Sequence, residues 1–355
     1  MAPQNQDLST SSLAEEDFAL IPENEHFHVE ERKLEINFRQ IYKNLRNLDY
    51  SKVSWRNVTL FVLLHIYSVY GLYLLFTACM WRTIAFTYLL YFLSAMGITM
   101  GAHRLWAHKS FKAKLPLRIF LAFCQTLAFQ NSIFEWSRDH RVHHKFSETD
   151  ADPHNAQRGF FFSHMGWLMY RKHPDVIKKG KTLDVSDLLN DPVVLFQKNY
   201  YVPLMVLACF VIPTFLPWYL WGETFINALM VPTFLRYCVT LHVTWMVNSL
   251  AHWIGSKPFD KDIYPSQNKL VATLALGEGW HNYHHVFPFD YRAAELGGII
   301  NFNATTDIID LFAKIGQAYD LKTASKDMQE KRAKRTGDGS RETGKTEKVI
   351  EIFKY

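Results

Sequence analysis

Residues 58–80 read VTLFVLLHIYSVYGLYLLFTACM, a run of 23 residues without a formal charge. A bilayer core about 30 Å thick needs about 20 such residues in a helix, so this stretch predicts a membrane span. Three further stretches of the same character follow at about residues 83–101, 200–221 and 224–245, and the last contains one charged residue, Arg236. Four predicted spans exclude a soluble protein. The mean hydropathy of -0.11 conceals them because the rest of the chain is very polar.

The predicted spans form two hairpins with very short turns. Of the 39 Lys and Arg side chains, only Arg82 and Arg236 lie within or between paired spans. The positive-inside rule then places the amino terminus, residues 102–199 and residues 246–355 on the cytosolic side. We therefore expect an all-α membrane protein with four transmembrane helices in two hairpins, capped by a cytosolic helical domain. Membrane lipid is the expected surrounding, and no nucleic-acid partner is expected.

The flanking segments are polar. Residues 1–50 carry ten acidic and five basic side chains, which predicts an acidic, partly disordered segment without a cleavable signal peptide. The membrane domain is expected over residues 51–321, and residues 322–355 are expected to form a charged, mostly loop-like or loosely helical tail. Residues 119–129 are apolar but too few to span, so they predict an interfacial or buried helix. The four cysteines lie in apolar stretches, which favours core packing over disulfides.

Nine of the sixteen histidines stand in four clusters beside the ends of the predicted spans or in the cytosolic segments. The clusters are HRLWAH (103–108), HRVHH (140–144), NSLAH (248–252) and HNYHH (281–285). Positions i, i+3 and i+4 share one face of a helix, so each HxxHH run presents three imidazoles in one direction, and two such faces can converge on a shared pair of metals. His103 and His108 are five apart, about 140° around an ideal helix. We therefore expect a break in the helix there, or separate metals.

Imidazole suits iron, copper, zinc and nickel. The absence of Cys ligands argues against an iron–sulfur cluster, and the separation of the clusters argues against a single structural zinc. The remaining histidines are interpreted as packing or surface residues, namely His26, His28, His65, His154, His164, His173 and His242. Three carboxylates lie close enough to the motifs to accept hydrogen bonds from imidazole N–H groups, with solvated surface groups as the alternative: Asp139, Glu278 and Asp290.

From about Trp55 to about Leu321 the sequence resembles the membrane acyl-CoA desaturases of the stearoyl-CoA desaturase type, and specifically their insect branch. The resemblance rests on GAHRLWAH, DHRVHHKF, DADPHN, RGFFFSHMGWL, NSLAH and GEGWHNYHHVFP. Histidine boxes at HX4H, HX2HH and HX2HH spacing, together with NX3H, form a very specific combination. The resemblance implies a non-haem centre of two Fe²⁺ ions. Its implied ligands are His103, His108, His140, His143, His144, His252, His281, His284 and His285, with Asn248 contacting through water.

The resemblance also implies substrate contacts. The acyl chain would enter a bent tunnel lined by Gln130, Trp136, Thr244 and Trp245, with Tyr91 near its closed end. Trp245 is two helical turns before His252, which places both on one face of a regular helix. Tyr91 lies 12 residues before His103, about 18 Å deeper along a straight helix. Ordinary packing or an aromatic belt is the alternative for Trp245 and Tyr91.

For the anionic coenzyme A headgroup, the resemblance points to Asn57, Arg138, Asp139, Arg171 and Lys172. Basic side chains match phosphate groups, although single Lys and Arg side chains on such a face are more often simply solvated.

The implied activity is insertion of a double bond into a saturated long-chain acyl-CoA, with O2 and electrons from cytochrome b5 and its NADH-dependent reductase, at the endoplasmic reticulum membrane. Carbon 9 and carbon 11 stay open as positions. The segment IYPSQN (263–268) resembles a variable signature of insect subgroups, and Gln267 leans toward the moth pheromone group acting at carbon 11.

Two other classes are weighed against this one. A membrane hydroxylase or alkane monooxygenase would share the histidine chemistry, but the NX3H element and the text between the boxes favour a desaturase. A metal or proton transporter is disfavoured because, tyrosines and cysteines aside, the spans contain only His65, Arg236 and His242 as ionisable residues.

Overall fold

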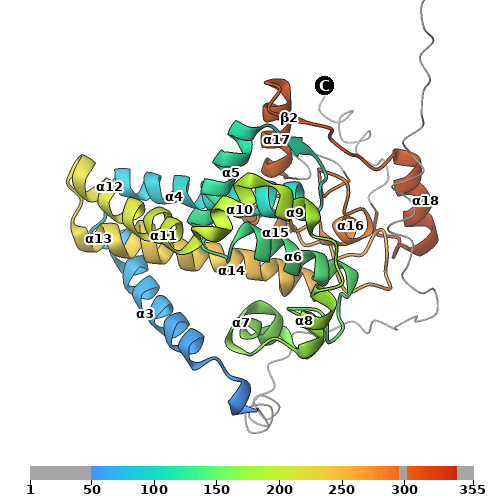
Figure 1. Cartoon of the computed structure of the whole chain (residues 1–355), viewed down its shortest axis with the longest axis horizontal. Helices are drawn as coiled ribbons and strands as arrows, with labels where there is room; N and C mark the ends of the chain where they lie inside the picture. The colour runs from blue at the N-terminus through green and yellow to red at the C-terminus, as the bar shows by residue number, and fades with distance from the viewer. Residues whose placement is uncertain (1–48, 296–301, 342–355) are drawn as a thin grey trace, which may run out of the picture.

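A computed structural model describes residues 49–295 and 302–341 (Figure 1). The predicted disorder near the amino terminus, His26 and His28 lie outside these residues. Most of the described chain is helical, and its named strands form one short antiparallel pair, β1 (Lys112–Ala113) and β2 (Ala318–Tyr319). The expected all-α architecture is thereby confirmed.

Four helices in the described residues are long and apolar enough to cross a membrane, as predicted. Their segments are α3 (Trp55–Thr77); α4 (Trp81–Met96) with η2 (Gly97–Ala107); α11 (Tyr201–Met205), η5 (Val206–Val211) and α12 (Ile212–Trp221); and α13 (Phe225–Leu229), η6 (Met230–Leu235), α14 (Arg236–Asn248) and η7 (Leu250–His252). The segments η2, η5 and η6 are π-helical, and η7 is a 3₁₀ turn. Figure 1 shows α12 and α13 at one end of the molecule, and α16 and α18 at the other.

The second and fourth of these helices are longer than the predicted spans. They run over Trp81–Ala107 and Phe225–His252, which is 27 and 28 residues. At 1.5 Å per residue, such a helix is about 40 Å long and exceeds a hydrocarbon core of about 30 Å. The final turns of both helices therefore have room to leave the membrane, and those turns carry His103 and His252.

The remaining helices form a cap at that end. The apolar stretch 119–129 forms most of α5, which packs on η2 and α4, as expected for a buried or interfacial helix. Ser132 and Glu135 form a capping box that starts α6. In chain order, the helices of the cap are η1 (Tyr50–Lys52), α5 (Leu115–Ala128), α6 (Ile133–Lys145), η3 (Ala156–Arg158), η4 (Phe162–Gly166), α7 (Trp167–Met169), α8 (Pro174–Gly180), α9 (Ser186–Asn190), α10 (Pro192–Asn199), α15 (Lys269–Leu274), α16 (His281–Val286), α17 (Ala304–Lys314) and α18 (Lys326–Thr336).

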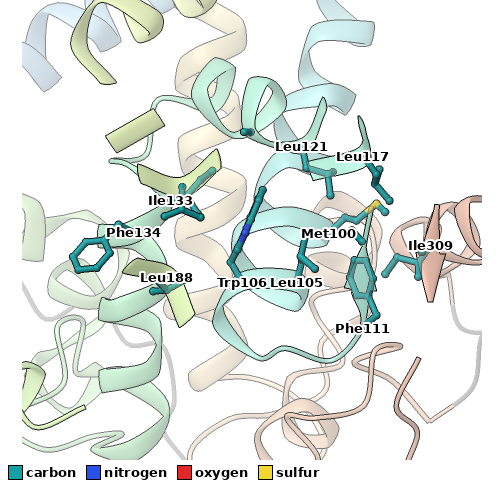
Figure 2. Close-up of a cluster of buried hydrophobic side chains, with 14 residues drawn as sticks. Met100, Leu105, Trp106, Phe111, Leu117, Leu121, Ile133, Phe134, Leu188 and Ile309 are labelled. Carbon is teal, nitrogen blue, oxygen red and sulfur yellow. The ribbon is translucent and has the colours of Figure 1, made fainter. Parts of the chain in front are cut away.

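A buried apolar cluster holds η2 in place. Figure 2 shows Met100, Phe111 and Ile309 gathered with Leu117 and Leu121 on one side of Trp106, while Ile133, Phe134 and Leu188 lie on its other side. The cluster joins η2 to α5, α6, α9 and α17. The segment that carries His103 and His108 is therefore backed by a tightly packed wall.

The beginning of the predicted tail is more ordered than expected. Residues Lys326–Thr336 form the regular helix α18. Its Gln329 side chain is buried and donates to the Tyr283 hydroxyl at 3.1 Å, and Arg332 pairs with Asp260. The sequence did not indicate this docking because the segment is highly charged overall, and only one face of α18 contacts the cap.

Candidate metal centre

The structure brings the nine clustered histidines together in two adjacent groups. The first contains His103, His108, His140, His144 and His284, and the second contains His143, His252, His281 and His285. Within each group the possible ligand atoms all lie within 4.8 Å of one another. The two groups touch, since the His144 and His285 rings stack with centroids 4.1 Å apart.

The π-helical segment η2 explains how His103 and His108 join one group. In a π-helix the backbone hydrogen bond runs from residue i+5 to residue i, which stacks residues five apart on one face. The His108 N–H donates to the His103 carbonyl at 3.1 Å, and the ring centroids are 4.9 Å apart. Of the two expectations from the sequence, a departure from regular helix is the one that occurs.

Each HxxHH run is divided between the groups. His140 and His144, four residues apart on α6, lie in the first group, and His143 lies in the second. The α16 run has the opposite division, since His281 and His285 lie in the second group and His284 in the first. The two runs therefore converge on a shared pair of positions.

Buried carboxylates fix the orientation of three rings. Nδ1 of His103 lies 2.9 Å from Glu278, Nδ1 of His252 lies 2.7 Å from Glu148, and Nδ1 of His143 lies 2.9 Å from Asp152. Because a carboxylate only accepts, each Nδ1 carries the hydrogen and each Nε2 keeps its lone pair.

Only one of the three carboxylates expected near the imidazoles plays this role, namely Glu278. Asp139 instead pairs with Arg138 and Lys172, and Asp290 pairs with Arg292 and accepts from the Tyr283 hydroxyl. Asp139 lies beside His140 on α6 but points to another face of that helix, and Asp290 lies beyond the end of α16, so nearness in sequence does not bring either carboxylate to the rings. Glu148 and Asp152 were missed because they lie in a loop after α6, where no periodic pattern indicates direction.

Burial also sets the protonation of the rings. It lowers the pKa of His108, His140, His144, His281, His284 and His285 well below the usual value for histidine. Burial acts in the same direction on His143, but the Asp152 carboxylate outweighs it and leaves the pKa of that ring raised. Asp152 itself is buried, yet the charge and hydrogen bond of His143 lower its pKa to about 2. Neutral imidazole is the form that binds metals.

The nitrogen contacts fit bound cations better than hydrogen bonds. Nε2 of His284 faces Nε2 of His103 at 2.9 Å and Nε2 of His144 at 3.0 Å. Nε2 of His281 likewise faces His252 at 3.0 Å and His285 at 3.1 Å. A neutral ring has one N–H and cannot serve two such contacts from a single nitrogen. The donor set, with imidazoles and no thiolate, therefore fits two first-row metal ions.

One cavity opens onto both groups. His103 and His140 of the first group and His281 of the second line it, together with Trp136 and Asn248. Toward α4, its lining continues to Tyr91, whose hydroxyl donates to the Leu274 carbonyl at 2.6 Å.

The other proposed acyl contacts differ in their relation to this cavity. Thr244 lines it and accepts a hydrogen bond from the Gln130 amide at 2.9 Å. Trp245 instead packs with Phe61 and Leu64 of α3. The expectation that Trp245 shares a face with His252 is wrong because α14 ends at Asn248 and the 3₁₀ turn η7 rotates the following residues.

The residues expected to contact a headgroup lie around the segment after α7. The Asn57 amide donates to the Leu168 carbonyl at 2.7 Å, and the Arg171 N–H donates to the Lys52 carbonyl at 2.8 Å. Lys172 and Arg138 both pair with Asp139 on α6. These contacts connect the start of α3 to α6.

Known proteins resemble this chain over most of its length. The sequence profile of the fatty acid desaturase family matches residues 80–295, which include all four histidine motifs. An acyl-CoA Delta-9 desaturase of Acheta domesticus is 61% identical over 82% of this chain and 81% of its own length. Stearoyl-CoA desaturase 5 of Bos taurus is 60% identical, with 81% of this chain and 85% of that protein covered. An acyl-CoA Delta(11) desaturase of Spodoptera littoralis is 56% identical, with the same coverage of 81% and 85%.

Proposed function

The chain belongs to the fatty acid desaturase family, and on that premise we propose that its nine clustered histidines hold two iron ions for the desaturation of a long-chain acyl-CoA. The activity is that of a fatty acyl-CoA desaturase acting at carbon 9 or carbon 11. The observation that carries the proposal is a cavity lined by imidazoles of both histidine groups.

The reaction needs a cofactor because no amino-acid side chain can remove two hydrogens from an unactivated methylene pair. When bound, two Fe²⁺ ions supply O2-dependent oxidising power. The protein turns three of the rings so that Nε2 faces the metals, because Glu278, Glu148 and Asp152 accept the Nδ1 hydrogens. Asn248, on the cavity wall, is proposed to contact one iron through water.

The substrate chain is proposed to lie along the cavity. Trp136 and Thr244 form its wall beside the histidines, and Tyr91 faces the methyl end. The Gln130–Thr244 hydrogen bond joins the loop before α6 to α14 across this wall. Trp245 supports the wall through its packing on α3. Fixing the methylene pair beside the metals removes most of the entropic cost of the reaction.

Coenzyme A is proposed to bind where α6 meets the segment after α7. Arg138, Arg171 and Lys172 supply positive charge for its phosphates, and Asp139 holds two of these side chains in place. Asn57 secures the start of α3 beside them. Coenzyme A is a cytosolic cofactor, so this placement and the positive-inside rule support a cytosolic cap on the endoplasmic reticulum membrane.

Electrons are proposed to come from cytochrome b5 and its NADH-dependent reductase. The sequence carries neither a haem-attachment motif nor a nucleotide-binding glycine loop. Docking of an acidic donor on a basic face should weaken with ionic strength. Turnover by the purified chain with NADH and O2 alone would contradict this partner.

The decisive experiment is expression in a yeast that lacks its own desaturase. Gas chromatography and mass spectrometry of derivatised lipids should show a monounsaturated acid, with its double bond at carbon 9 or carbon 11. His284→Ala at matched expression should give no product, while His26→Ala should behave like wild type. Turnover of purified protein should scale with iron content and not with zinc, which binds such ligands more tightly in the Irving–Williams order. A hydroxylated acid as the main product would assign the chain to the hydroxylases instead.

A further inference from the structure

Three histidines outside the two groups form a continuous string between α3, α14 and η4. Nε2 of His65 lies 2.9 Å from Nε2 of His242, and Nδ1 of His242 lies 3.0 Å from Nε2 of His164. Nδ1 of His164 then lies 2.9 Å from the Ser249 hydroxyl. From the sequence these histidines had been interpreted as packing or surface residues. Their mutual contacts depend on residues far apart in the chain.

The two ends of the string lie beside carbonyl groups. Nδ1 of His65 lies 2.6 Å from the Phe61 carbonyl, and the Ser249 hydroxyl lies 2.8 Å from the Trp245 carbonyl. A carbonyl only accepts, so the hydrogen of His65 must be on Nδ1 and its Nε2 presents a lone pair to His242. The serine hydroxyl can turn, so it either donates to the Trp245 carbonyl and accepts from Nδ1 of His164, or donates to Nδ1 of His164.

The string can present two lone pairs to a metal ion without leaving any of its polar groups unpaired. With its hydrogen on Nδ1, a neutral His164 accepts at Nε2 from the Nδ1 hydrogen of His242. Nε2 of His242 then also presents a lone pair, and it faces the lone pair of His65 Nε2 at 2.9 Å. Without an ion the string is satisfied in the opposite order: the Ser249 hydroxyl turns to donate to Nδ1 of His164, and His164 and His242 each donate from Nε2 to the next ring. With an ion bound, the Nε2 lone pairs of His65 and His242 become ligands, and every other group in the string keeps its hydrogen-bond partner.

A third possible ligand completes this position. The Cys238 sulfur lies one helical turn before His242, and the possible ligand atoms of His65, Cys238 and His242 all lie within 4.8 Å of one another. Cys238 is buried beside Leu64, Leu241 and Trp245, and the Ser68 hydroxyl lies within hydrogen-bond reach of its sulfur. We propose that His65, Cys238 and His242 form a third metal site, separate from the two histidine groups, which binds a soft metal ion between α3 and α14.

Ligand chemistry and charge narrow the choice of ion. A thiolate with two imidazoles suits Cu⁺ and Zn²⁺. With one thiolate and two neutral rings, Cu⁺ gives a site of zero net charge, whereas Zn²⁺ leaves one positive charge in a membrane-spanning segment. A net charge is costly there, which favours the monovalent ion.

The site would join two helices that separate elsewhere. Figure 1 shows the amino-terminal half of α3 diverging from α14 toward α7. His242 lies two residues before Thr244, which lines the cavity. The His242 ring also contacts the Trp245 ring. A metal ion at this point therefore ties α3 to the helix that forms the cavity wall.

Metal stoichiometry of the purified full-length protein tests the proposal. Samples are titrated with Cu⁺ under anaerobic conditions against a competing chromogenic chelator, and in parallel with Zn²⁺, while iron is measured separately. The variants are His242→Asn, which keeps a polar group facing His164, and Cys238→Ser. Cys124→Ser, at another buried cysteine, is the matched control.

Wild type and Cys124→Ser should bind one equivalent of soft metal that both His242→Asn and Cys238→Ser lose, with iron content unchanged in all four proteins. Binding of either Cu⁺ or Zn²⁺ supports the site if both His242→Asn and Cys238→Ser abolish it. Equal soft-metal stoichiometry in wild type and both variants would overturn the proposal. Retained iron shows that a variant is folded. A loss of soft metal with iron retained therefore concerns the third site alone, whereas the iron centre is tested independently by His284→Ala.

Discussion

At the scale of single residues, the candidate centre depends on which nitrogen of each ring carries the hydrogen. Three carboxylates place this hydrogen on Nδ1, since Glu278, Glu148 and Asp152 each accept from Nδ1 of one ring. Of these carboxylates, Asp152 is nearly fully buried and also accepts the backbone N–H groups of Glu148 and His154. It therefore fixes both a ring and the loop that follows α6.

Asp152→Asn should weaken iron binding without removing a ligand. The amide can present its NH2 group to Nδ1 of His143, which favours the tautomer with its hydrogen on Nε2. Loss of such an outer partner costs typically about 10-fold to 100-fold in metal affinity or activity. Iron content after dialysis against a graded chelator measures the effect. Asp150→Asn, two residues away, is the control, and equal iron retention in both variants would remove Asp152 from this role.

Tyr91→Ala should shift the product profile toward longer acyl chains while the double-bond position counted from the carboxyl end stays fixed. The ring lines the far part of the cavity and is held by its hydroxyl on Leu274. The shift should be graded, because one methylene of misfit is worth only about 1 to 3 kcal/mol.

Tyr91→Phe separates bulk from hydrogen bonding, since it keeps the ring and loses the hydroxyl. Its product ratio across saturated substrates of increasing length should match wild type. If Tyr91→Ala lowers yield equally for every length, the residue acts in packing and does not limit chain length.

At the scale of elements, the π-helical segment η2 is the feature that turns a sequence motif into a site. The i+5 hydrogen bond brings His103 and His108 to one face, and the buried cluster of Figure 2 supports the opposite side of the segment. A π-helix is rare because its backbone geometry is poor, so it persists only where packing enforces it. The close approach of α5 to the start of η2 is one such constraint.

Gly97→Ala should disturb this constraint. A Cβ at Gly97 would lie 2.2 Å from the backbone carbon of Cys124 and from the backbone nitrogen of Gln125. Backbone atoms cannot rotate away, so α5 must shift, at a cost of about 1 to 3 kcal/mol typical of overpacking. We expect a lower melting temperature and reduced iron content.

Gly180→Ala serves as the matched control for Gly97→Ala. The nearest atom to its Cβ would be a Val142 methyl group at 3.6 Å, an ordinary contact. If both variants melt at the wild-type temperature and keep their iron, the close packing of α5 does not hold η2 in place.

At the scale of the whole molecule, distant segments complete the site. The carboxyl-terminal helix α18 reaches the HNYHH motif (281–285) through Gln329 and Tyr283. The segment IYPSQN also meets this motif, because the Asn282 amide donates to the Pro265 carbonyl at 2.9 Å. The subgroup signature therefore contacts the scaffold of α16, while the residues that line the cavity come from other segments.

Truncation after Ala324 should destabilise the HNYHH motif. It removes Gln329 and the Arg332–Asp260 pair, and it uncovers the apolar cluster of Phe259 and Tyr283. We expect a lower melting temperature and partial loss of iron from the purified protein. Truncation after Arg341 keeps α18 and is the control. Wild-type stability of the shorter chain would show that the docking of α18 contributes nothing to the centre.

The sequence alone determined the four spans and the nine candidate ligands, because hydrophobic length and i, i+3, i+4 spacing are local properties of a helix. It also indicated a departure from regular helix between His103 and His108, since the angle between residues five apart follows from helix geometry. The same geometry does not hold for Trp245 and His252, because the 3₁₀ turn after Asn248 changes the rotation of the residues that follow it.

Only the tertiary structure decided how the imidazoles divide into two groups, which carboxylates turn them, and that His65 meets His242. Each of these contacts joins residues on different helices or in an irregular loop, where chain spacing sets no direction. The packing of helices against one another fixes such pairs, and a periodic pattern along one helix carries no information about its partner's rotation.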